Sequence, residues 1–300
     1  MPTPAFGGST AHAVSNATEI NLKKMKRCPA NNSAARHSHL EVGKPLAKEA
    51  ISKAADCNNH NPSVTPATES GKGFLHAPDQ RVLRRPAPSL AARKVSGASK
   101  AHFTGRMVIP DPEAPAGRIL LSESKLEISW TIYLLSLPEV ETVIEQVPVI
   151  WIDDDGARRT KYFDLVIVFR NGRRVACEVK PEVRLASGRV RRELRKIAAQ
   201  IHGEFDDVRL LTDKQLCPEA VFNAELFFGM READPEADAA ACKVVNALAG
   251  AATLSDLRVA IGLGGRGLRA LVRLIAAGRL RLCGEGRIHP SRLVRRTEVA

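Results

Sequence analysis

Hydrophobic and polar positions follow different patterns in three parts of the chain. In residues 1–106 the apolar side chains show no sustained period, so neither helices nor strands are expected there. From about residue 118 to residue 228, apolar runs of strand length alternate with stretches of helical spacing. Residues 239–289 hold shorter helical patterns separated by glycines. The pattern predicts a mixed α/β core between an irregular N-terminal region and a small, mainly helical C-terminal region.

The strongest predicted element is a β-hairpin in the middle of the chain. Two apolar runs, residues 163–169 and 175–179, flank an Asn-Gly pair, which is typical of tight hairpin turns. Each run holds one acid, Asp164 in the first and Glu178 in the second. Lys180 follows Glu178 by two positions and therefore points to the same face of its strand. Buried acids are costly unless they are paired or hold a metal ion, so this hairpin is the first candidate for a functional site.

The length of the turn decides whether the two acids meet. A two-residue turn would place Asp164 and Glu178 on opposite faces of the hairpin. A three-residue turn over residues 170–172, with its glycine in the left-handed conformation, would pair Phe169 with Arg173 and set the two acids directly opposite each other. We predict the three-residue turn, because directly opposed side chains have Cβ atoms about 4.5–5.5 Å apart and can share one divalent cation. An edge hairpin whose acids face water is the alternative.

Further elements are predicted on both sides of the hairpin. A helix capped by Ser122 or Ser124 runs to Pro138, and a strand at 142–152 contains Pro148, which suggests an edge position or a bulge. Beyond the hairpin, the core continues with a basic helix at 189–201, a strand at 208–211 and a helix at 216–228. In the C-terminal region we expect a helix at 239–248, a helix opened by the capping box at 253–256 and a third helix bearing 268–275. A two-stranded wing is expected from 280–282 and 287–289. The last three helices and the wing are typical of a winged helix-turn-helix.

Charge is distributed unevenly along the 300 residues. The net charge of +12 divides into +10 for residues 1–106, −5 for residues 107–253 and +7 for residues 254–300. An acidic middle between basic ends suits a metal-binding core flanked by segments attracted to phosphate backbones. We therefore predict a disordered basic region over 1–106, an α/β domain over 107–232 and a winged-helix-like domain over 233–300.

Other classes of function find little support in the sequence. The six cysteines are scattered without paired spacing, so neither a zinc site nor a disulfide framework is predicted, and a reducing cytoplasm is the expected compartment. No apolar run reaches the ~18 residues of a membrane span, and the chain has no signal-peptide pattern. No Gly-Lys-Ser/Thr phosphate loop is present, so ATP hydrolysis by this chain is not expected.

Basic side chains on two predicted helices are candidates for DNA contact. One helix has an apolar face and an opposite cationic face, and the third C-terminal helix has the same design. A solvated surface is the alternative for the first helix, and a protein-docking surface for the second. The candidate residues are Arg191, Arg192 and Arg195 on the first helix and Arg266, Arg269 and Arg273 on the second.

The spacing of Asp164, Glu178 and Lys180 resembles the PD-(D/E)xK nuclease motif, and Glu-Val-Lys-Pro at 178–181 is similar to the form found in TnsA-like transposon endonucleases. Three further segments match that family in the same order, which are Glu-Ser-Lys-Leu-Glu at 123–127, Val-Ile-Glu-Gln-Val-Pro at 143–148 and Arg-Leu-Leu-Thr-Asp at 209–213. The resemblance covers about residues 118–228. Tyr-Phe at 162–163 departs from the family pattern, in which proline usually precedes the aspartate.

The resemblance implies a restriction-endonuclease-like mixed sheet flanked by helices and a metal-dependent DNA endonuclease. Glu127, rather than Glu123, would join Asp164 and Glu178 in holding Mg²⁺, for which Mn²⁺ would substitute. Lys180 would orient the attacking water or neutralise charge in the transition state. Gln146 would support the site without binding the ion.

The family also implies biological partners. The chain would cut double-stranded DNA at transposon 5′ ends beside a DDE-type transposase and an AAA+ ATPase regulator, in a bacterial cytoplasm and associated with the nucleoid. Two alternatives remain open. One is a stand-alone restriction or repair nuclease of the same fold, and the other is a non-catalytic winged-helix DNA-binding regulator.

Overall fold

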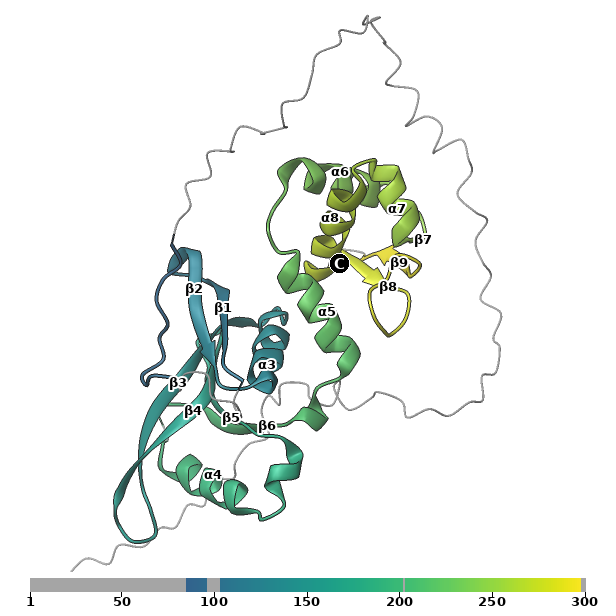
Figure 1. Cartoon of the computed structure of the whole chain (residues 1–300). Helices are drawn as coiled ribbons and strands as arrows, with labels where there is room; N and C mark the ends of the chain where they lie inside the picture. The colour runs from purple at the N-terminus through teal and green to yellow at the C-terminus, as the bar shows by residue number, and fades with distance from the viewer. Residues whose placement is uncertain (1–84, 96–102, 202, 298–300) are drawn as a thin grey trace, which may run out of the picture. The chain divides into compact units, whose positions relative to one another are not determined.

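The computed structural model describes residues 85–95, 103–201 and 203–297, and in these ranges the chain has a mixed α/β fold (Figure 1). Its strands form a two-stranded, a four-stranded and a three-stranded sheet, with helices between them. Within the same ranges, no helix combines the length and the apolar character needed to cross a membrane.

The four-stranded sheet contains the predicted hairpin. Its strand order is β3-β4-β5-β6, with β3, β4 and β5 antiparallel in turn and β6 parallel to β5. Because β3 lies at the edge of the sheet, Pro148 costs no hydrogen bond to a second neighbour, as its position in the sequence suggested. The strands are β3 (Val140–Ile152), β4 (Arg158–Phe169), β5 (Arg174–Val179) and β6 (Asp207–Leu211).

The hairpin between β4 and β5 has the predicted three-residue turn. Leu165 pairs with Cys177, and the N–H of Phe169 donates to the carbonyl of Arg173 at 2.9 Å. Gly172 has φ +82°, the left-handed conformation that this turn requires. The predicted register is therefore confirmed.

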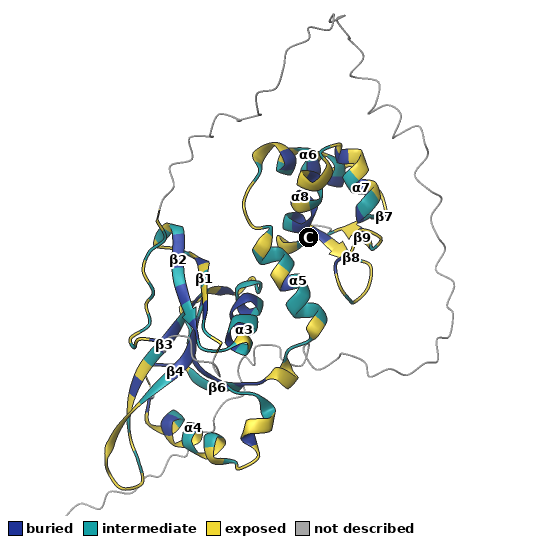
Figure 2. Cartoon of the chain, in the orientation of Figure 1, coloured by how far each residue is buried: buried dark blue, intermediate teal, exposed yellow. Residues whose placement is uncertain are grey.

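Helices cover both sides of this sheet (Figure 1). The side chain of Ser124 caps α3 by accepting from the N–H of Glu127, and α3 packs against β2, β3 and β4. On α4 the apolar side chains Leu194 and Ile197 join a buried cluster with the sheet, while the arginine-bearing side is exposed (Figure 2). The helical elements here are α3 (Lys125–Leu135), η1 (Glu182–Leu185), α4 (Arg189–Gln200), η2 (Asp213–Gln215) and α5 (Pro218–Gly229).

A second hairpin, β1 (Gly105–Asp111) with β2 (Ala114–Ser122), was not predicted. Prolines at positions 110, 112 and 115 interrupt its alternating pattern, which explains why sequence periodicity missed it. Its buried side chains include Ile109 and Leu120, both fully covered. The hairpin, which precedes α3 in the sequence, therefore contributes buried side chains to the core.

Residues 85–95 correct the prediction of a disordered region over 1–106. The N–H of Ala87 donates to the carbonyl of Gly117 at 2.8 Å, and the N–H of Ile119 donates to the carbonyl of Ala87 at 2.9 Å. Backbone hydrogen bonds with β2 order this segment, and such bonds leave no hydrophobic period in the sequence. Residues 1–84 and 96–102, which were part of the same prediction, lie outside the described residues.

The C-terminal region has a hydrophobic core of its own. Residues from each of its helices and each of its strands contribute buried side chains, among them Leu254, Leu271 and Val294. Its sheet has the order β7-β9-β8, with both pairs antiparallel. The elements are α6 (Pro235–Asn246), β7 (Ala251–Thr253), α7 (Leu254–Ile261), α8 (Gly264–Ala276), β8 (Leu280–Leu282) and β9 (Leu293–Arg296).

Two details of the prediction for this region were wrong. Helix α6 begins at Pro235 with Asp234 as its N-cap, four residues before the expected start, because proline is well suited to the first helical position. The partner of β8 is β9 and not residues 287–289. Val294 of β9 and Ile288 of the expected segment are both buried in the same core, but the residues paired with β8 belong to β9.

Candidate active site

The β4–β5 hairpin brings Asp164, Glu178 and Lys180 together, as predicted. Leu165–Cys177 is the registered pair next to Asp164 and Glu178. Beyond that pair, the N–H of Val179 donates to Asp164 Oδ2 at 2.7 Å. Lys180 Nζ lies 3.2 Å from Asp164 Oδ2 and 2.9 Å from Glu178 Oε1. One ammonium group thus bridges the two carboxylates at the end of the hairpin.

A second lysine, Lys161, also contacts the acidic pair. Its Nζ lies 3.1 Å from Glu178 Oε1 and 3.4 Å from Glu193 Oε1 on α4. Glu178 therefore holds two ammonium groups on one carboxylate oxygen. Sequence reasoning missed Lys161, since nothing in its position three residues before Asp164 distinguishes it from a surface lysine.

Glu127 from α3 lies near the hairpin acids and is almost fully buried. Its Oε1 accepts from the hydroxyl of Ser124 at 2.8 Å, and its Oε2 accepts from the N–H of Glu123 at 2.8 Å. Burial, and next the negative charge of Asp164, raise the pKa of Glu127 to about 7. The side chain of Glu123 instead pairs with Arg93 at 2.6 Å and is partly exposed. Of these two glutamates, Glu127 is the one placed beside Asp164.

The acids of the site act on one another through their charges. Burial and the neighbouring carboxylate of Glu178 raise the pKa of Asp164, against the opposing effect of Lys180. For Lys180, burial alone would lower the pKa, but the charges of Asp164 and Glu178 outweigh it and raise the pKa. The ammonium group of Lys180 is thus held in its charged form by the same carboxylates that it bridges.

Gln146, on β3, occupies the position across from Asp164 of β4. It lies between two registered pairs, Glu145–Leu165 and Val147–Phe163. Its φ of +52° is the one positive value among the non-glycine residues that the structure describes. Its side chain is fully buried, and its Nε2 has no hydrogen-bond partner in the described part of the chain. A strained backbone and an unpaired amide beside the acids are typical of a functional site.

The arrangement of the acids bears on whether they could hold a cation. In residues 85–95, 103–201 and 203–297, no three His, Cys, Asp or Glu side chains are already grouped closely enough to form a metal site. Nevertheless, Glu178 Oε2 is buried and has no hydrogen-bond partner there. Burying a carboxylate oxygen without a partner is costly, and a cation bound beside it would remove that cost. The donor set of Glu127, Asp164 and Glu178 fits a hard, oxygen-loving ion in its chemistry.

The arginines predicted for DNA contact on α4 differ in their surroundings. Arg191 pairs with Glu182 at 3.0 Å. Arg192 and Arg195 are exposed, and neither forms an ion pair with a described residue. Their charges are available to an external phosphate, whereas that of Arg191 is already matched.

On α8 two of the three predicted arginines bind acids of α6. Arg266 contacts Asp234 at 2.7 Å and Glu236 at 2.6 Å, and it lowers the pKa of Asp234 to about 2. Arg273 donates two hydrogen bonds to Asp238 Oδ1, at 2.6 and 2.8 Å. Arg269 is exposed and makes no such pair within the described ranges. Two of these guanidinium groups therefore already join helices within the C-terminal region.

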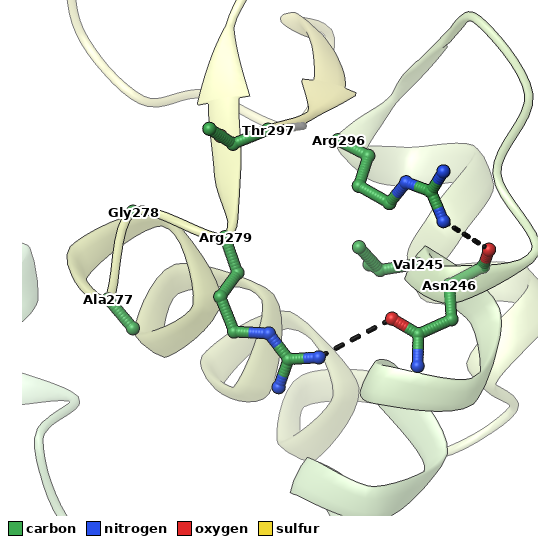
Figure 3. Close-up of a pocket in the computed structure, with 7 residues that line it drawn as sticks. All are labelled: Val245, Asn246, Ala277, Gly278, Arg279, Arg296 and Thr297. Atoms are coloured by element: carbon green, nitrogen blue, oxygen red, sulfur yellow. Dashed lines mark hydrogen bonds between the residues drawn. The ribbon is translucent and has the colours of Figure 1, made fainter. Parts of the chain in front are cut away.

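A pocket of about 520 Å³ lies in the C-terminal region, and none of the acidic-cluster residues lines it (Figure 3). Arg279 and Arg296 both point toward Asn246, contacting its side-chain Oδ1 at 3.4 Å and its backbone carbonyl at 2.9 Å. Asn246 is the last residue of α6, so Arg296 satisfies a carbonyl at the C-terminal end of that helix, and Arg279 binds the side chain of the same residue. This explains their convergence without a ligand.

The residues that sequence reasoning missed have a common origin in tertiary structure. Arg93 lies in a segment without hydrophobic period, and its contacts with Gln146 and Glu123 depend on how residues 85–95 fold against the sheet. Gln146 was expected only as support, and its positive φ has no signature in a single sequence.

Comparison of the chain with known protein families finds no family that matches it, and a search of curated proteins finds no matching relative.

Proposed function

We propose that this protein is a Mg²⁺-dependent DNA endonuclease of the PD-(D/E)xK type. The observation that carries the proposal is the cluster in which Lys180 bridges Asp164 and Glu178 at the end of the hairpin. The sheet order with helices on both sides is compatible with a restriction-endonuclease-like core. Helices α6 to α8 with the β7-β9-β8 sheet would form the winged helix-turn-helix.

Each residue of the cluster has a chemical role in this proposal. Glu127, Asp164 and Glu178 would hold the ion, which when bound activates water and neutralises charge on the scissile phosphate. The N–H of Val179 fixes one oxygen of Asp164 at 2.7 Å, and Ser124 fixes one oxygen of Glu127 at 2.8 Å, so these carboxylates are oriented in advance.

Lys180 would act on the phosphate directly. Its ammonium group is charged and held within 3.2 Å of both hairpin acids, and its side chain is one-third exposed, so it can donate a hydrogen bond to an incoming substrate. A donor held in place before the reaction stabilises negative charge that develops on the phosphate oxygens. The exposed Arg192 and Arg195 would position the DNA backbone.

The resemblance to TnsA-like endonucleases supports a biological setting for this chemistry. In that setting the chain cuts double-stranded DNA at the 5′ ends of a transposon, working with a DDE-type transposase and an AAA+ ATPase. No phosphate-binding Gly-Lys-Ser/Thr loop occurs in this sequence, so an ATPase would have to be a separate subunit.

The proposal is tested by plasmid cleavage with Mg²⁺ or Mn²⁺, using the full chain alone and with a transposase from the same gene neighbourhood. Asp164→Ala and Lys180→Ala should each reduce cutting by about 100-fold or more while DNA binding is retained. Asp155→Asn, an exposed acid at the tip of the β3–β4 hairpin, is the matched control and should cut normally. Undiminished cutting by both site variants would overturn the proposal.

The same experiment separates the two alternatives. Cutting by the purified chain without any partner would indicate a stand-alone restriction or repair nuclease. A non-catalytic DNA-binding regulator is the other alternative. Calorimetry that detects neither Mg²⁺ nor Mn²⁺ binding, together with intact DNA binding, would support the regulator.

A further inference from the structure

Residues 85–95, here called the strap, cross the strands that precede and adjoin the candidate site. The strap pairs with β2 through the backbone of Ala87, and the hydroxyl of Ser89 donates to the buried carboxylate of Glu145. Further along, the N–H of Ala92 donates to the carbonyl of Gln146 at 3.3 Å. Contacts at three positions of the strap thus bring it along the sheet toward the acids before Arg93 is reached.

Arg93 contacts two residues, Gln146 and Glu123, that lie beside different carboxylates of the site. Its Nε donates to Gln146 Oε1 at 2.6 Å, and its NH2 group pairs with Glu123 Oε2 at 2.6 Å. The guanidinium also lies over the ring of Tyr162, 5.5 Å from the ring centre. A planar guanidinium can hold two such acceptors in fixed directions, whereas an ammonium group cannot.

The first contact leads to Asp164. Gln146 lies across from Asp164 in the β3–β4 register, and its backbone has the unusual φ of +52°. The strap binds both the carbonyl and the side-chain oxygen of Gln146. A left-handed conformation at a non-glycine residue persists only where its surroundings hold it, and here the strap supplies two of the holding bonds.

The second contact leads to Glu127. The side chain of Glu123 is bound by Arg93, and the N–H of the same residue donates to Glu127 Oε2 at 2.8 Å. Fixing Glu123 therefore fixes the donor that orients the buried carboxylate. Asp164 and Glu127 come from different elements, β4 and α3. Arg93 is joined to the donor that orients Glu127 and to the β3 residue that lies across from Asp164.

We infer that Arg93 is a positioning residue of the active site and that the strap is part of the cation-binding unit. This inference rests on the proposed function in that Asp164 and Glu127 are taken as ligands of the ion. Arg93 itself touches neither the ion nor the DNA. It holds the donor that orients Glu127 and the β3 backbone that lies beside Asp164.

Positioning and simple electrostatics predict opposite effects on cation affinity. If Arg93 acted only as a nearby positive charge, its removal would strengthen the binding of a divalent cation. If it acts by orienting the carboxylates, its removal weakens binding, and loss of such supporting contacts typically costs about 10- to 100-fold in metal affinity. The sign of the change therefore distinguishes the two roles.

The test measures Mn²⁺ binding to the full chain by titration calorimetry in the absence of DNA. Arg93→Ala should bind Mn²⁺ at least 10-fold more weakly than the wild type. Arg93→Lys should recover little of this affinity, because lysine keeps the charge but lacks the planar pair of guanidinium donors. Lys94→Ala removes an exposed neighbouring charge and should bind normally. Gln146→Met removes the acceptor from the other side and should weaken binding too, with no further loss when combined with Arg93→Ala.

Each result decides the inference. Equal or tighter Mn²⁺ binding by a folded Arg93→Ala overturns it, and so does an additive loss in the double variant. If Arg93→Ala fails to fold, Gln146→Met decides, and normal Mn²⁺ binding by that variant overturns the inference. Wild type that binds Mn²⁺ but cuts no DNA, either alone or with the transposase, overturns the nuclease proposal, while the inference still stands or falls on the affinities. Wild type that binds no Mn²⁺ overturns both.

Discussion

Glu178 receives two ammonium groups on the same carboxylate oxygen, and the two lysines differ in what else they touch. Lys180 also reaches Asp164, the second acid of the hairpin, whereas Lys161 reaches Glu193 on α4. Lys161 is the less exposed of the two, with 19% of its side-chain area accessible against 33% for Lys180. In the proposed function, Lys180 would therefore be the lysine that meets substrate, while Lys161 joins Glu178 to Glu193 on α4.

The two lysines are expected to have separable effects when each is replaced by methionine. Lys180→Met should lower the single-turnover cleavage rate by about 100-fold or more, because a positioned donor to the phosphate is lost. Lys161→Met should lower it much less and should chiefly lower the melting temperature, because Glu193 and Glu178 lose their shared cation. Single-turnover kinetics and thermal unfolding of both variants provide the measurement. Equal rate losses would contradict this division of roles.

At the scale of single elements, α4 carries one matched and two unmatched arginines on its exposed side. Arg191 pairs with Glu182, while Arg192 and Arg195 lack an ion pair with any residue in the described ranges. Since all three were candidates for DNA contact from sequence, the pairing divides them into two groups that substitution can compare.

Substitution on α4 should affect DNA binding through its dependence on salt. Arg192→Gln and Arg195→Gln should each reduce the slope of log K against log salt by about 0.9, the value for one phosphate contact on duplex DNA. Arg191→Gln should change the slope little, because its charge is balanced by Glu182. Binding isotherms at several salt concentrations measure this, and identical slopes for all variants would show that α4 does not meet DNA.

The contact between α6 and α8 predicts a dependence of stability on acid pH. Arg266 lowers the pKa of Asp234 from 3.8 to about 2, so the ionised pair stabilises the folded state above pH 4, and its contribution disappears as the pH falls toward 2. Asp234→Asn removes the charge but keeps a good N-cap for α6. The melting temperature of the wild type should therefore exceed that of Asp234→Asn at pH 5 and converge with it near pH 2. A constant difference across this range would contradict the assignment.

The elements differ in how well the sequence predicted them, for physical reasons. The β4–β5 register was predictable because one local feature, a left-handed glycine in a three-residue turn, determines which residues face each other. The choice of β9 as the partner of β8 was not, because β9 also pairs with β7 in a three-stranded sheet assembled from segments distant in the sequence. The strap was missed because backbone hydrogen bonds and a single guanidinium hold it, and neither has a period in the sequence.

The site shows the same division. Asp164, Glu178 and Lys180 follow from a short hairpin, so spacing brought them together correctly. Preference for Glu127 over Glu123 came from family resemblance, and the structure places Glu127 beside Asp164 while Arg93 binds Glu123. Lys161 and Arg93 reach the site only through tertiary folding, which one sequence does not reveal.

At the scale of the whole chain, the N-terminal region combines two separable contributions. Residues 1–84 carry 11 Lys and Arg against 6 Asp and Glu, a net charge that attracts DNA without sequence preference. The strap that follows binds Glu145 and Gln146, both fully buried. A chain that begins at Met107 lacks both contributions, whereas a chain that begins at residue 85 lacks only the first.

These two shortened chains should therefore fail in different ways. The chain beginning at residue 85 should bind DNA more weakly at low salt but keep its melting temperature and its affinity for Mn²⁺. The chain beginning at Met107 should melt at a lower temperature, because the Gln146 side chain loses its bond to Arg93 inside the protein, and loss of a buried hydrogen bond costs about 1–3 kcal/mol. Its Mn²⁺ affinity should fall as that of Arg93→Ala does. Thermal unfolding and calorimetry on both chains measure this, and matching behaviour of the two would mean that the strap contributes nothing beyond its charge.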